Sequence, residues 1–202
     1  MECESCQSRR FLFSARDGYV HCEVCQACKT CSAECGGRGF IFETSADGYR
    51  FAKDCPCTKM MNRAELMSRA RLPSRYFQAE CGRIHVEGGE SDIKTARSLS
   101  FRFTHEFEAG DPGLLFYGPT GTGKTLLACC ILKSLVLKKG IACRFIEFGH
   151  LLNELKNAFE RPNGVEQVIQ PLIDVTVLAV DELGKGRGTE WELSVLDELI
   201  SK

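Results

Sequence analysis

The stretch that decides the predicted fold is GLLFYGPTGTGKTLLACCILKSL, residues 113–135. Within it, residues 118–125 read GPTGTGKT, which fits the G-x-x-x-x-G-K-[ST] pattern of a phosphate-binding loop. An apolar run precedes the loop and an apolar helical pattern follows it. A glycine-rich turn with a chance lysine needs no such surroundings, whereas a nucleotide-binding loop lies between a buried strand and a helix. The stretch therefore predicts an α/β protein that binds a nucleotide.

Each residue type in this loop has a part in holding phosphates. Glycines allow the tight turns that bring backbone amides against the phosphates, where the N-terminus of the following helix adds a favourable dipole. Lys124 brings a mobile positive charge to the terminal phosphates, and the hydroxyl of Thr125 is a magnesium ligand. The residues expected to contact ATP are Gly118, Pro119, Thr120, Gly121, Thr122, Gly123, Lys124 and Thr125.

A second part of the same site is expected at Asp181 and Glu182, which follow the apolar run of residues 175–180. An acidic pair at the end of a strand is common and by itself suggests only a structural role. Downstream of a phosphate-binding loop in one sheet, it predicts that Asp181 holds the magnesium shell and that Glu182 orients and deprotonates the attacking water. Lys124, Asp181 and Glu182 are thus the candidate catalytic residues of an ATP hydrolase, with ATP and Mg²⁺ as cofactors.

From residue 113 onward, strand and helix patterns alternate, which is typical of a parallel sheet with crossover helices. The last helix is expected to begin with a capping box formed by Thr189 and Glu192. Earlier helical patterns cover residues 61–72 and a lead-in helix over residues 91–107. Strands are predicted at residues 113–118, 141–148 and 174–180, and helices at residues 123–139, 148–160 and 189–202.

Cysteines are concentrated near the N-terminus, since nine of the 13 lie between Cys3 and Cys57. The N-terminal residues show no signal peptide, and disulfides are rare in reducing compartments, so metal thiolates are favoured over disulfides. The most apolar helical pattern, residues 126–137, is interrupted by Lys133 and is shorter than the about 20 apolar residues that cross a bilayer. We therefore expect a cytoplasmic protein without a membrane partner.

Residues 1–60 contain an internal repeat with a β-hairpin pattern. The first copy has Cys6, Phe11 and Phe13, followed by Asp-Gly-Tyr at residues 17–19; the second has Cys35, Phe40 and Phe42, followed by Asp-Gly-Tyr at residues 47–49. Each copy predicts a cysteine knuckle, an outgoing strand, a turn at Asp-Gly and a returning strand that leads to further cysteines. The chain thus uses one small hairpin unit twice.

The cysteine spacing predicts two zinc sites. The spacing C-x2-C-x15-C-x2-C is that of four-thiolate zinc sites, in which two knuckles place four sulfurs around one structural Zn²⁺. A second site follows from the repeat, where Cys28 could replace Cys31 and an interleaved arrangement is also open. Reduced thiols without metal and an iron–sulfur cluster are the alternatives. The predicted ligands are Cys3, Cys6, Cys22 and Cys25 for the first site, and Cys31, Cys35, Cys55 and Cys57 for the second.

The overall charge does not favour nucleic acid as a partner, because the formal net charge is −1. Two local segments are basic: residues 63–75, with four arginines against one glutamate, and residues 184–188, with the sequence GKGRG. Either could contact phosphates, yet each is read more simply as solvated surface. Single-stranded DNA is therefore only a secondary candidate partner.

With these motifs in hand, residues from about 71 onward resemble the DnaC/IstB-type AAA+ ATPases. The resemblance rests on RARLPSRYFQ (residues 69–78), the phosphate-binding loop, VLAVDELG (residues 177–184) and TEWELSVLDELI (residues 189–200). It implies a P-loop NTPase parallel sheet, here a partial AAA+ module, preceded by a small zinc-ribbon-like β-hairpin domain. It also implies homo-oligomers of the full-length protein that use ATP to load a replicative helicase in DNA replication or to assist a transposase.

The N-terminal region adds a second resemblance. Some loaders of this family grip the helicase with a zinc-binding N-terminal domain, so the protein partner is expected to bind there. The stretch CGGRGF (residues 35–40) is also similar to the cysteine knuckles of DnaJ-type chaperones. The expected domains are a cysteine-rich domain at residues 1–60, a linker with the lead-in helix at residues 61–110, and the N-terminal part of the ATP-binding domain at residues 111–202.

The resemblance also shows what is absent from these 202 residues. In the family, the module continues into a strand with a polar sensor residue and then an arginine that completes the site of a neighbouring subunit. That strand inserts between the phosphate-loop strand and the strand of the acidic pair. We therefore expect ATP hydrolysis only when the missing C-terminal part is supplied, and the alternative is a zinc-bearing binding module with an inactive ATPase remnant.

Overall fold

Two parallel strands form the centre of the ATP-binding region. The computed structural model describes residues 3–6, 10–28, 35–36, 38–80, 91–185 and 188–201. Strand β5 (Cys143–Glu147) pairs in parallel with β6 (Val177–Asp181), and Glu147 lies opposite Asp181 at the C-terminal end of the pair. The connection between them runs through two helices, as a parallel pair requires. The predicted α/β fold class is confirmed by this strand pair and its helices.

Helix α3 (Lys124–Ser134) begins directly after the glycine-rich loop, as the sequence predicts. Its C-terminal end continues as a π-helical turn, η4 (Leu135–Lys139), and stops at Gly140 with φ of 74°, a left-handed conformation that glycine adopts without strain. The side chains of Leu127, Cys129, Leu132 and Leu135 on this segment are buried. The helix thus holds the loop in place by packing against the core.

The strand predicted at residues 113–118 does not form, and this prediction was wrong. These residues adopt no regular structure, and the side chains of Leu115 and Tyr117 are 78% and 90% exposed. A strand is stable only when a neighbour takes up its backbone hydrogen bonds. Among the described residues, β5 and β6 pair only with each other, and residues 113–118 pair with neither strand.

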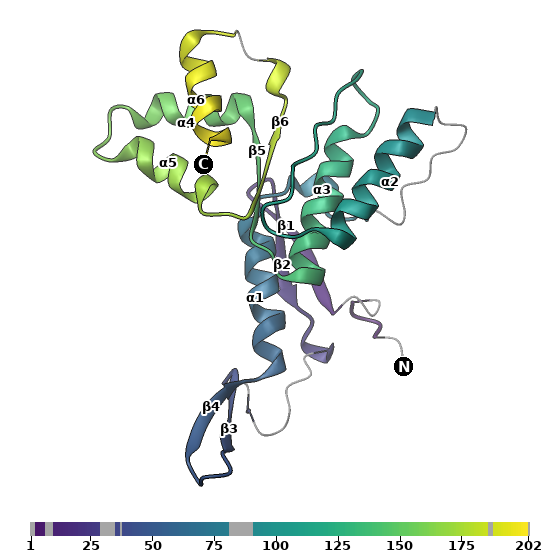
Figure 1. Ribbon diagram of the computed structural model, residues 1–202, viewed down its shortest axis with the longest axis vertical. Helices are drawn as coiled ribbons and strands as arrows, with labels where there is room; N and C mark the ends of the chain where they lie inside the picture. Colours follow the sequence, from purple (N-terminus) through teal and green to yellow (C-terminus); the bar gives the residue numbers. More distant parts are fainter. Residues whose placement is uncertain are drawn as a thin grey trace.

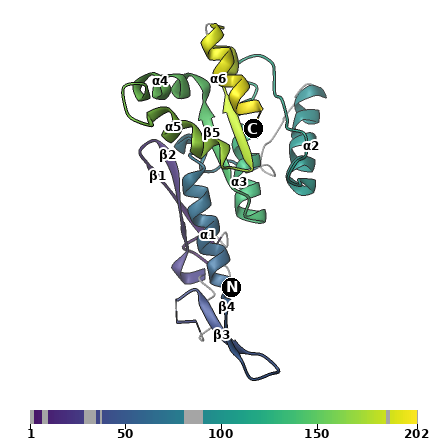
Figure 2. The ribbon, with the colours of Figure 1, turned by 60° about the vertical axis from the view of Figure 1, so that its left-hand side comes forward.

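Helices α4 (Phe148–Ala158), α5 (Gly164–Ile173) and α6 (Glu190–Ile200) lie together beside the strand pair (Figures 1 and 2), on the face opposite to the one that packs against α3. Helix α4 matches the prediction, whereas α5 was missed, because Pro162 ends one helical pattern without showing that another begins. Helix α6 starts with the predicted capping box of Thr189 and Glu192. These helices share a hydrophobic core with β5 and β6 that includes Leu151, Leu155, Ile169, Leu172 and Val195.

The first repeat forms the hairpin β1 (Phe11–Arg16) and β2 (Tyr19–Val24), as predicted. It packs on α1 (Pro56–Arg69), the helix that follows the second repeat. Phe11, Val20 and Cys22 are buried in one hydrophobic core with residues of α1, α3 and β5. The predicted domain boundary at residue 60 stays a prediction, but the first hairpin shares its core with the ATP-binding region.

The second repeat forms the hairpin β3 (Phe40–Thr44) and β4 (Arg50–Asp54), again as predicted. This hairpin lies at the far end of α1 from the strand pair β5 and β6 (Figures 1 and 2). Every residue of β4 is exposed, in contrast to the alternating burial of β2. The two copies of the unit therefore occupy different surroundings in one chain.

Helix α2 (Ser91–Glu106) is the predicted lead-in helix and lies beside α3 (Figure 1). Phe103 and Phe107 pack against the core of the first hairpin, and their ring centroids lie 5.2 Å apart. Leu99, on the same helix, is 38% exposed. Among the helices that the structure describes, none has the length and apolar character needed to span a bilayer.

Candidate functional site

The phosphate-binding loop forms an open, glycine-lined turn at the surface. Gly118, Gly121 and Gly123 have φ of 140°, 86° and 88°, which side-chain-bearing residues rarely adopt, so glycine is required here. No heavy atom lies within 4 Å of the position where a Cβ would stand on any of them. The backbone of the loop is therefore accessible to a ligand as large as a triphosphate.

Lys124 lies at the first position of α3 and folds back over the loop. Its Nζ donates hydrogen bonds to the carbonyl oxygens of Gly118, at 2.9 Å, and Pro119, at 2.7 Å. The hydroxyl of Thr122 donates to the same Pro119 oxygen at 3.0 Å. The ammonium group thus already sits above the loop, where incoming phosphate oxygens can replace the two carbonyls as acceptors.

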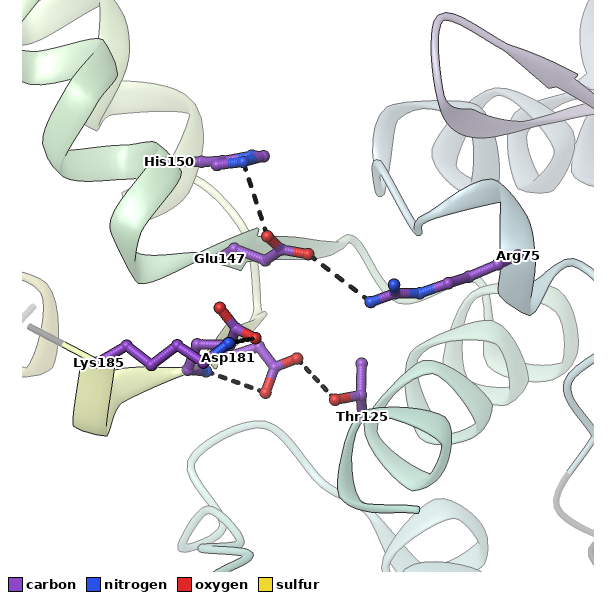
Figure 3. Close-up of polar contacts among 7 residues, drawn as sticks. Arg75, Thr125, Glu147, His150, Asp181 and Lys185 are labelled. Carbon is purple, nitrogen blue, oxygen red and sulfur yellow. Dashed lines mark hydrogen bonds and ion pairs between the residues drawn. The ribbon is translucent and has the colours of Figure 1, made fainter. Parts of the chain in front are cut away.

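Thr125 and Asp181 meet although 56 residues separate them in sequence. The hydroxyl of Thr125, on α3, donates a hydrogen bond of 2.7 Å to Oδ2 of Asp181, at the end of β6 (Figure 3). A hydroxyl and a carboxylate are hard oxygen donors of the kind that Mg²⁺ prefers. The two residues expected to bind magnesium therefore lie side by side and fit that ion.

Glu182 adopts a left-handed conformation with φ of 60°, which turns the chain sharply after β6. Its backbone N–H donates to Oδ1 of Asp181 at 3.0 Å, and its carboxylate pairs with Nζ of Lys185 at 2.5 Å. This hydrogen bond with Glu182 raises the pKa of Lys185 above its ordinary value. A water-activating role for Glu182 would require that its carboxylate leave Lys185.

Three residues near the acidic pair were missed by the sequence reasoning. Glu147, at the end of β5, lies opposite Asp181 in the register of the strands. Its carboxylate is 4.0 Å from Nη2 of Arg75 and 3.7 Å from Nε2 of His150 (Figure 3). Glu147 could have been predicted as a site residue, because the C-terminal ends of neighbouring parallel strands lie at one edge of a sheet. The partners Arg75 and His150 depend on tertiary packing.

The first cysteine cluster contains Cys3, Cys6, Cys25 and Cys28, whose sulfur atoms all lie within 4.8 Å of one another. The sulfur atoms of Cys3 and Cys25 are 3.8 Å apart, and those of Cys6 and Cys28 are 3.4 Å apart. Four thiols gathered in this way fit the ligand set of a structural Zn²⁺ site. Cys28, which the sequence reasoning left over, therefore completes the first group.

The placement of Cys22 in this group was wrong. Cys22 lies within β2, where Val20 and Cys22 point to the same, buried face of the hairpin because side chains alternate along a strand. Its thiol is only 4% exposed within the core, and its backbone is hydrogen-bonded to Ser68 of α1. Cys25 escapes this constraint because it lies beyond the end of the strand. Burial also raises the pKa of the Cys22 thiol to about 12, which keeps it neutral.

The thiols of the first cluster differ in pKa. A hydrogen bond from the backbone of Cys6 lowers the pKa of Cys3 to about 6, whereas hydrogen bonds from Cys3 and Cys6 raise the pKa of Cys28 to about 12. Burial raises the pKa of Cys25. One thiolate in such a group therefore opposes ionisation of the others, and a cation is needed to hold four thiolates together.

The second cluster consists of Cys35, Cys55 and Cys57, all fully buried at the base of the β3–β4 hairpin. The sulfur atoms of Cys35 and Cys57 are 3.7 Å apart, and the backbone N–H of Gly39 donates to the Cys35 sulfur at 3.2 Å. Such amide donation to sulfur stabilises a thiolate. These three thiols fit a zinc site that takes its fourth ligand elsewhere; the predicted fourth ligand, Cys31, lies outside the described residues.

The remaining cysteines and the basic segments show mainly structural contacts. Burial raises the pKa of Cys129 and Cys143 to about 12, as expected for small buried side chains. Arg69 pairs with Glu65, and Arg71 pairs with Glu154 while lying over the ring of Tyr19. The second basic segment extends into residues 186–187, which are outside the described part of the chain.

Comparison with known proteins agrees with this geometry. The family model described as "IstB-like ATP binding protein" matches residues 59–202, which include the phosphate-binding loop, the acidic pair and Glu147. The match begins within α1 and leaves out both hairpins. The family therefore accounts for the ATP-binding region, whereas the cysteine clusters are additional to it.

Two helicase loaders and one uncharacterized protein align over most of the chain. The replicative helicase loader DnaC of Escherichia coli (strain K12) is 28% identical over 149 residues, and that of Buchnera aphidicola subsp. Baizongia pistaciae (strain Bp) is 24% identical over 146 residues; each alignment spans about 70% of this chain and 58% of the relative. The uncharacterized protein YqaM of Bacillus subtilis (strain 168) is 22% identical over 160 residues, 75% of this chain and 50% of the relative. The chain thus spans between half and three-fifths of these relatives.

The family model covers far more than half of the 202 residues, and the helicase loader of Escherichia coli aligns over 70% of the chain. The loop, the Thr125–Asp181 contact and the parallel strand pair supply the structural basis of that match. The chain belongs to the IstB-like ATP-binding proteins, the DnaC/IstB type of AAA+ ATPase.

Proposed function

We propose that this chain is the ATP-binding part of a cytoplasmic helicase loader, which couples ATP binding and hydrolysis to delivery of a replicative helicase to DNA. The observation that carries the proposal is the hydrogen bond of 2.7 Å between Thr125 and Asp181, because it joins the phosphate-binding loop to the acidic pair in one site. The similarity to DnaC supports helicase loading as the use of that site.

The residues of the loop and the acidic pair have separate tasks in this proposal. Backbone amides of residues 118–125 bind the phosphates, and Lys124 exchanges its bonds with the Gly118 and Pro119 carbonyls for bonds with phosphate oxygens. Thr125 and Asp181 would hold Mg²⁺, which offsets negative charge on the phosphates when it is bound. Glu182 releases Lys185, orients a water molecule and accepts its proton.

Full turnover in this proposal depends on groups outside the described residues. Arg75 brings a positive charge to Glu147, which lies opposite Asp181 in the strand register. Oligomers of the full-length protein would supply further positive charge from a neighbouring subunit. Weak activity of the isolated chain is therefore consistent with a working site.

A second candidate function is help to a transposase at its DNA target. The family model itself favours this candidate, because it describes IstB-like proteins and not loaders alone. The nucleotide chemistry is the same in both candidates, and only the protein partner differs. An inactive ATPase remnant beside a zinc-bearing binding module is the third reading, and it differs by predicting no hydrolysis.

We also propose that each cysteine cluster holds one zinc ion. The first takes Cys3, Cys6, Cys25 and Cys28; the second takes Cys35, Cys55 and Cys57 with a fourth ligand from residues that include Cys31. Zinc would supply the positive charge that four neighbouring thiolates require. The bound ions would fix the bases of the two hairpins, which lack enough apolar surface to fold alone.

The test of the proposed function compares two lysine variants of the 202-residue chain and of its full-length protein. Lys124→Ala is expected to lower magnesium-dependent ATP hydrolysis by about a hundredfold, because it removes a charged donor to the transferred phosphate. Lys138→Ala, an exposed lysine on the same helical segment, is the matched control and should leave hydrolysis unchanged. Equal activity of Lys124→Ala and the parent protein would contradict the ATPase proposal.

The partner is tested separately by sedimentation of the full-length protein with the purified replicative helicase or transposase of the source organism. A helicase complex that loads onto single-stranded DNA only with ATP supports the loader. A complex with the transposase and none with the helicase supports the second candidate and rejects the first. Failure to hydrolyse or bind ATP in the full-length protein leaves the binding-module reading.

A further inference from the structure

The β3–β4 hairpin has one face on which two aromatic rings are partly exposed to solvent. In the register of this hairpin, Phe40 pairs with Asp54, Phe42 with Ala52 and Thr44 with Arg50, so alternation along the strands puts these six side chains on one face. We call this set the aromatic face. Phe40 is 37% exposed and Phe42 is 50% exposed, while Ile41, on the opposite face, packs against the second cysteine cluster. Two aromatic rings are thus partly in solvent on one face of the hairpin, and on the other face, among the described residues, Ile41 alone packs against the cysteines.

The first hairpin shows what the same unit does when its equivalent face is covered. Phe11 and Phe13 correspond to Phe40 and Phe42 in the repeat. Phe11 is only 8% exposed, and Phe13 is partly buried against the same core. The face they share with Val20 and Cys22 packs on helices of the same chain. The aromatic pair is therefore packed within the chain in the first copy and partly exposed in the second.

We propose that the aromatic face of the β3–β4 hairpin is a docking surface for an α-helix of a partner protein, and that this helix carries apolar side chains beside acidic ones. The inference rests on the part of the proposed function in which a protein partner binds the N-terminal region, and it gives that partner a surface and a chemistry. The corresponding contact within the chain is the packing of α1 and α3 on the first hairpin.

A helix is the form of partner that the first hairpin selects. Ser68 of α1 accepts a hydrogen bond from the backbone of Cys22 at 3.0 Å, and its hydroxyl lies 3.2 Å from the Cys22 carbonyl oxygen. On the same hairpin, Nζ of Lys133 of α3 lies 4.5 Å from the centroid of the Phe13 ring. Both contacts come from helical side chains: the Ser68 hydroxyl meets the backbone of β2, and the Lys133 ammonium meets the ring of Phe13. The second hairpin has shorter strands and a longer turn, but its outgoing strand carries the same pair of phenylalanines on one face.

The positive charges beside the rings indicate that the docked helix carries acidic side chains. The guanidinium of Arg38 lies 5.8 Å from the ring centroid of Phe40, and that of Arg50 lies 4.9 Å from the ring centroid of Phe42. Each aromatic ring therefore has a solvent-exposed cation beside it. Carboxylates on a docked helix would pair with these arginines as the apolar side chains cover the rings, and such pairs set partner choice and orientation.

Nucleic acid fits this face less well. The rings of Phe40 and Phe42 meet edge to face, with planes 86° apart, and guanidinium groups lie over them, so they do not offer a row of open faces for stacking bases. Residues 38–54 also carry as many acidic side chains (Glu43, Asp47, Asp54) as basic ones (Arg38, Arg50, Lys53). A strand of phosphates would meet no net positive charge there.

The base of the hairpin is fixed well enough to present this face. Cys35, Cys55 and Cys57 are fully buried beneath it. The backbone N–H of Cys55 donates to the carbonyl oxygen of Gly39 at 2.8 Å, and the hydroxyl of Thr58 on α1 donates to the same oxygen. A surface that is ordered before binding loses less conformational entropy when the partner arrives.

The experiment places a photo-crosslinking phenylalanine analogue in the full-length protein in cells of the source organism, in place of Phe42 in one strain and Phe51 in another. Phe51 is the matched control, because it is an aromatic residue of the same hairpin, 46% exposed, on the opposite face. The crosslinked segment is identified by mass spectrometry. We expect a crosslink at position 42 to a helix with acidic side chains, at least about tenfold stronger than at position 51.

A second variant tests the role of charge. Arg50→Glu in the strain with the analogue at position 42 should lower the crosslink by about tenfold, because it puts like charges together in the interface. Zinc content and ATP binding, measured on the purified variants, should match the parent protein, which excludes misfolding. Equal crosslinks at positions 42 and 51, a crosslink to DNA, or a crosslinked protein segment that is not helical would overturn the inference.

The identity of the crosslinked protein separates this inference from the proposed function. A helical segment of the replicative helicase supports both. A helical acidic segment of another protein supports the docking surface and counts against helicase loading. Absence of any crosslink at position 42, in cells where the full-length protein still binds the helicase, rejects the docking surface and leaves the proposed function in place.

Discussion

The two hairpins of the N-terminal region are copies of one unit that lie in different surroundings. Each has an aromatic pair on its outgoing strand, an Asp-Gly turn and cysteines at its base. The first is buried against α1 and α3, and the second has its aromatic face in solvent. Two copies of one sequence unit can therefore have different surroundings. The first hairpin contributes to the core of the chain itself, whereas the second has a face that a partner protein can cover.

The returning strand explains this difference. In the first hairpin, Val20, Cys22 and Val24 lie beside the aromatic pair, so the whole face is apolar. In the second, Arg50, Ala52 and Asp54 take the matching positions. Burying the two charges without partners would cost several kcal/mol. The first face is thus suited to permanent burial, and the second remains compatible with water until a partner with complementary charges covers it.

The largest expected effect concerns the metal sites at the bases of the hairpins. Cys28→Ala should remove about one zinc ion per chain, because the first cluster would lose a ligand and structural zinc binding is worth on the order of 10 kcal/mol. Cys22→Ala should leave the zinc content unchanged, because its thiol lies in the core. Metal analysis of the purified variants measures both. Loss of zinc in Cys22→Ala and retention in Cys28→Ala would restore the ligand set expected from the spacing alone.

The next effect compares equivalent aromatic residues. Phe11→Ala should lower the free energy of unfolding by about 3 kcal/mol, because the Phe11 ring is buried in the shared core. Phe40→Ala should lower it by less than about 1 kcal/mol, because the ring is already partly in solvent. Urea unfolding of the zinc-loaded chain gives both values. Similar losses in the two variants would mean that the second aromatic face is covered within the chain.

The pH dependence of stability distinguishes the returning strands, since Cys22 of the first hairpin matches Ala52 of the second. Burial raises the pKa of Cys22 from its ordinary value of 9.0 to about 12. The unfolded chain therefore loses this proton before the folded chain does, so the stabilisation is complete below pH 9 and is lost as the pH rises toward 12.

Replacing this thiol gives the measurement. The free energy of unfolding of the parent chain should fall more steeply between pH 9.5 and 11 than that of Cys22→Ala, by up to about 1.4 kcal/mol per pH unit. Cys129 and Cys143, which are also buried thiols with raised pKa values, contribute equally to both proteins and cancel. Parallel pH profiles would show that Cys22 is not a neutral core thiol.

The smallest expected effect lies in the turns. Asp17 and Gly18 both have positive φ, 51° and 82°, in a two-residue turn, whereas the second hairpin uses a longer turn in which Gly48 has φ of 82° and Asp47 does not. Asp17→Val should therefore cost about 1 kcal/mol, and Asp47→Val close to nothing. Urea unfolding measures the difference, and equal costs would mean that the two turns share one conformation.

The sequence predicted local features well because they depend on neighbours in the chain. The helix after the glycine-rich loop, its end at Gly140, the capping box of Thr189 and Glu192, and both Asp-Gly hairpins formed where the patterns placed them. Helix α5 was missed although Asn163, followed three residues later by Glu166, is a typical helix-start pattern, because Pro162 was read only as the end of the preceding helix. The assigned roles of Lys124, Asp181 and Glu182 stay predictions that the lysine variants test.

What the sequence by itself determined was where the loop motif and the acidic pair lie along the chain, because each is a run of a few consecutive residues, and their catalytic roles stay predictions. The tertiary structure decided which distant groups meet. Strand alternation turned Cys22 into the core and left Cys28 to complete the first cluster, and parallel register placed Glu147 opposite Asp181. It also left residues 113–118 without a strand partner among the described residues, because apolarity marks a preference for burial but only a neighbour can take up backbone hydrogen bonds.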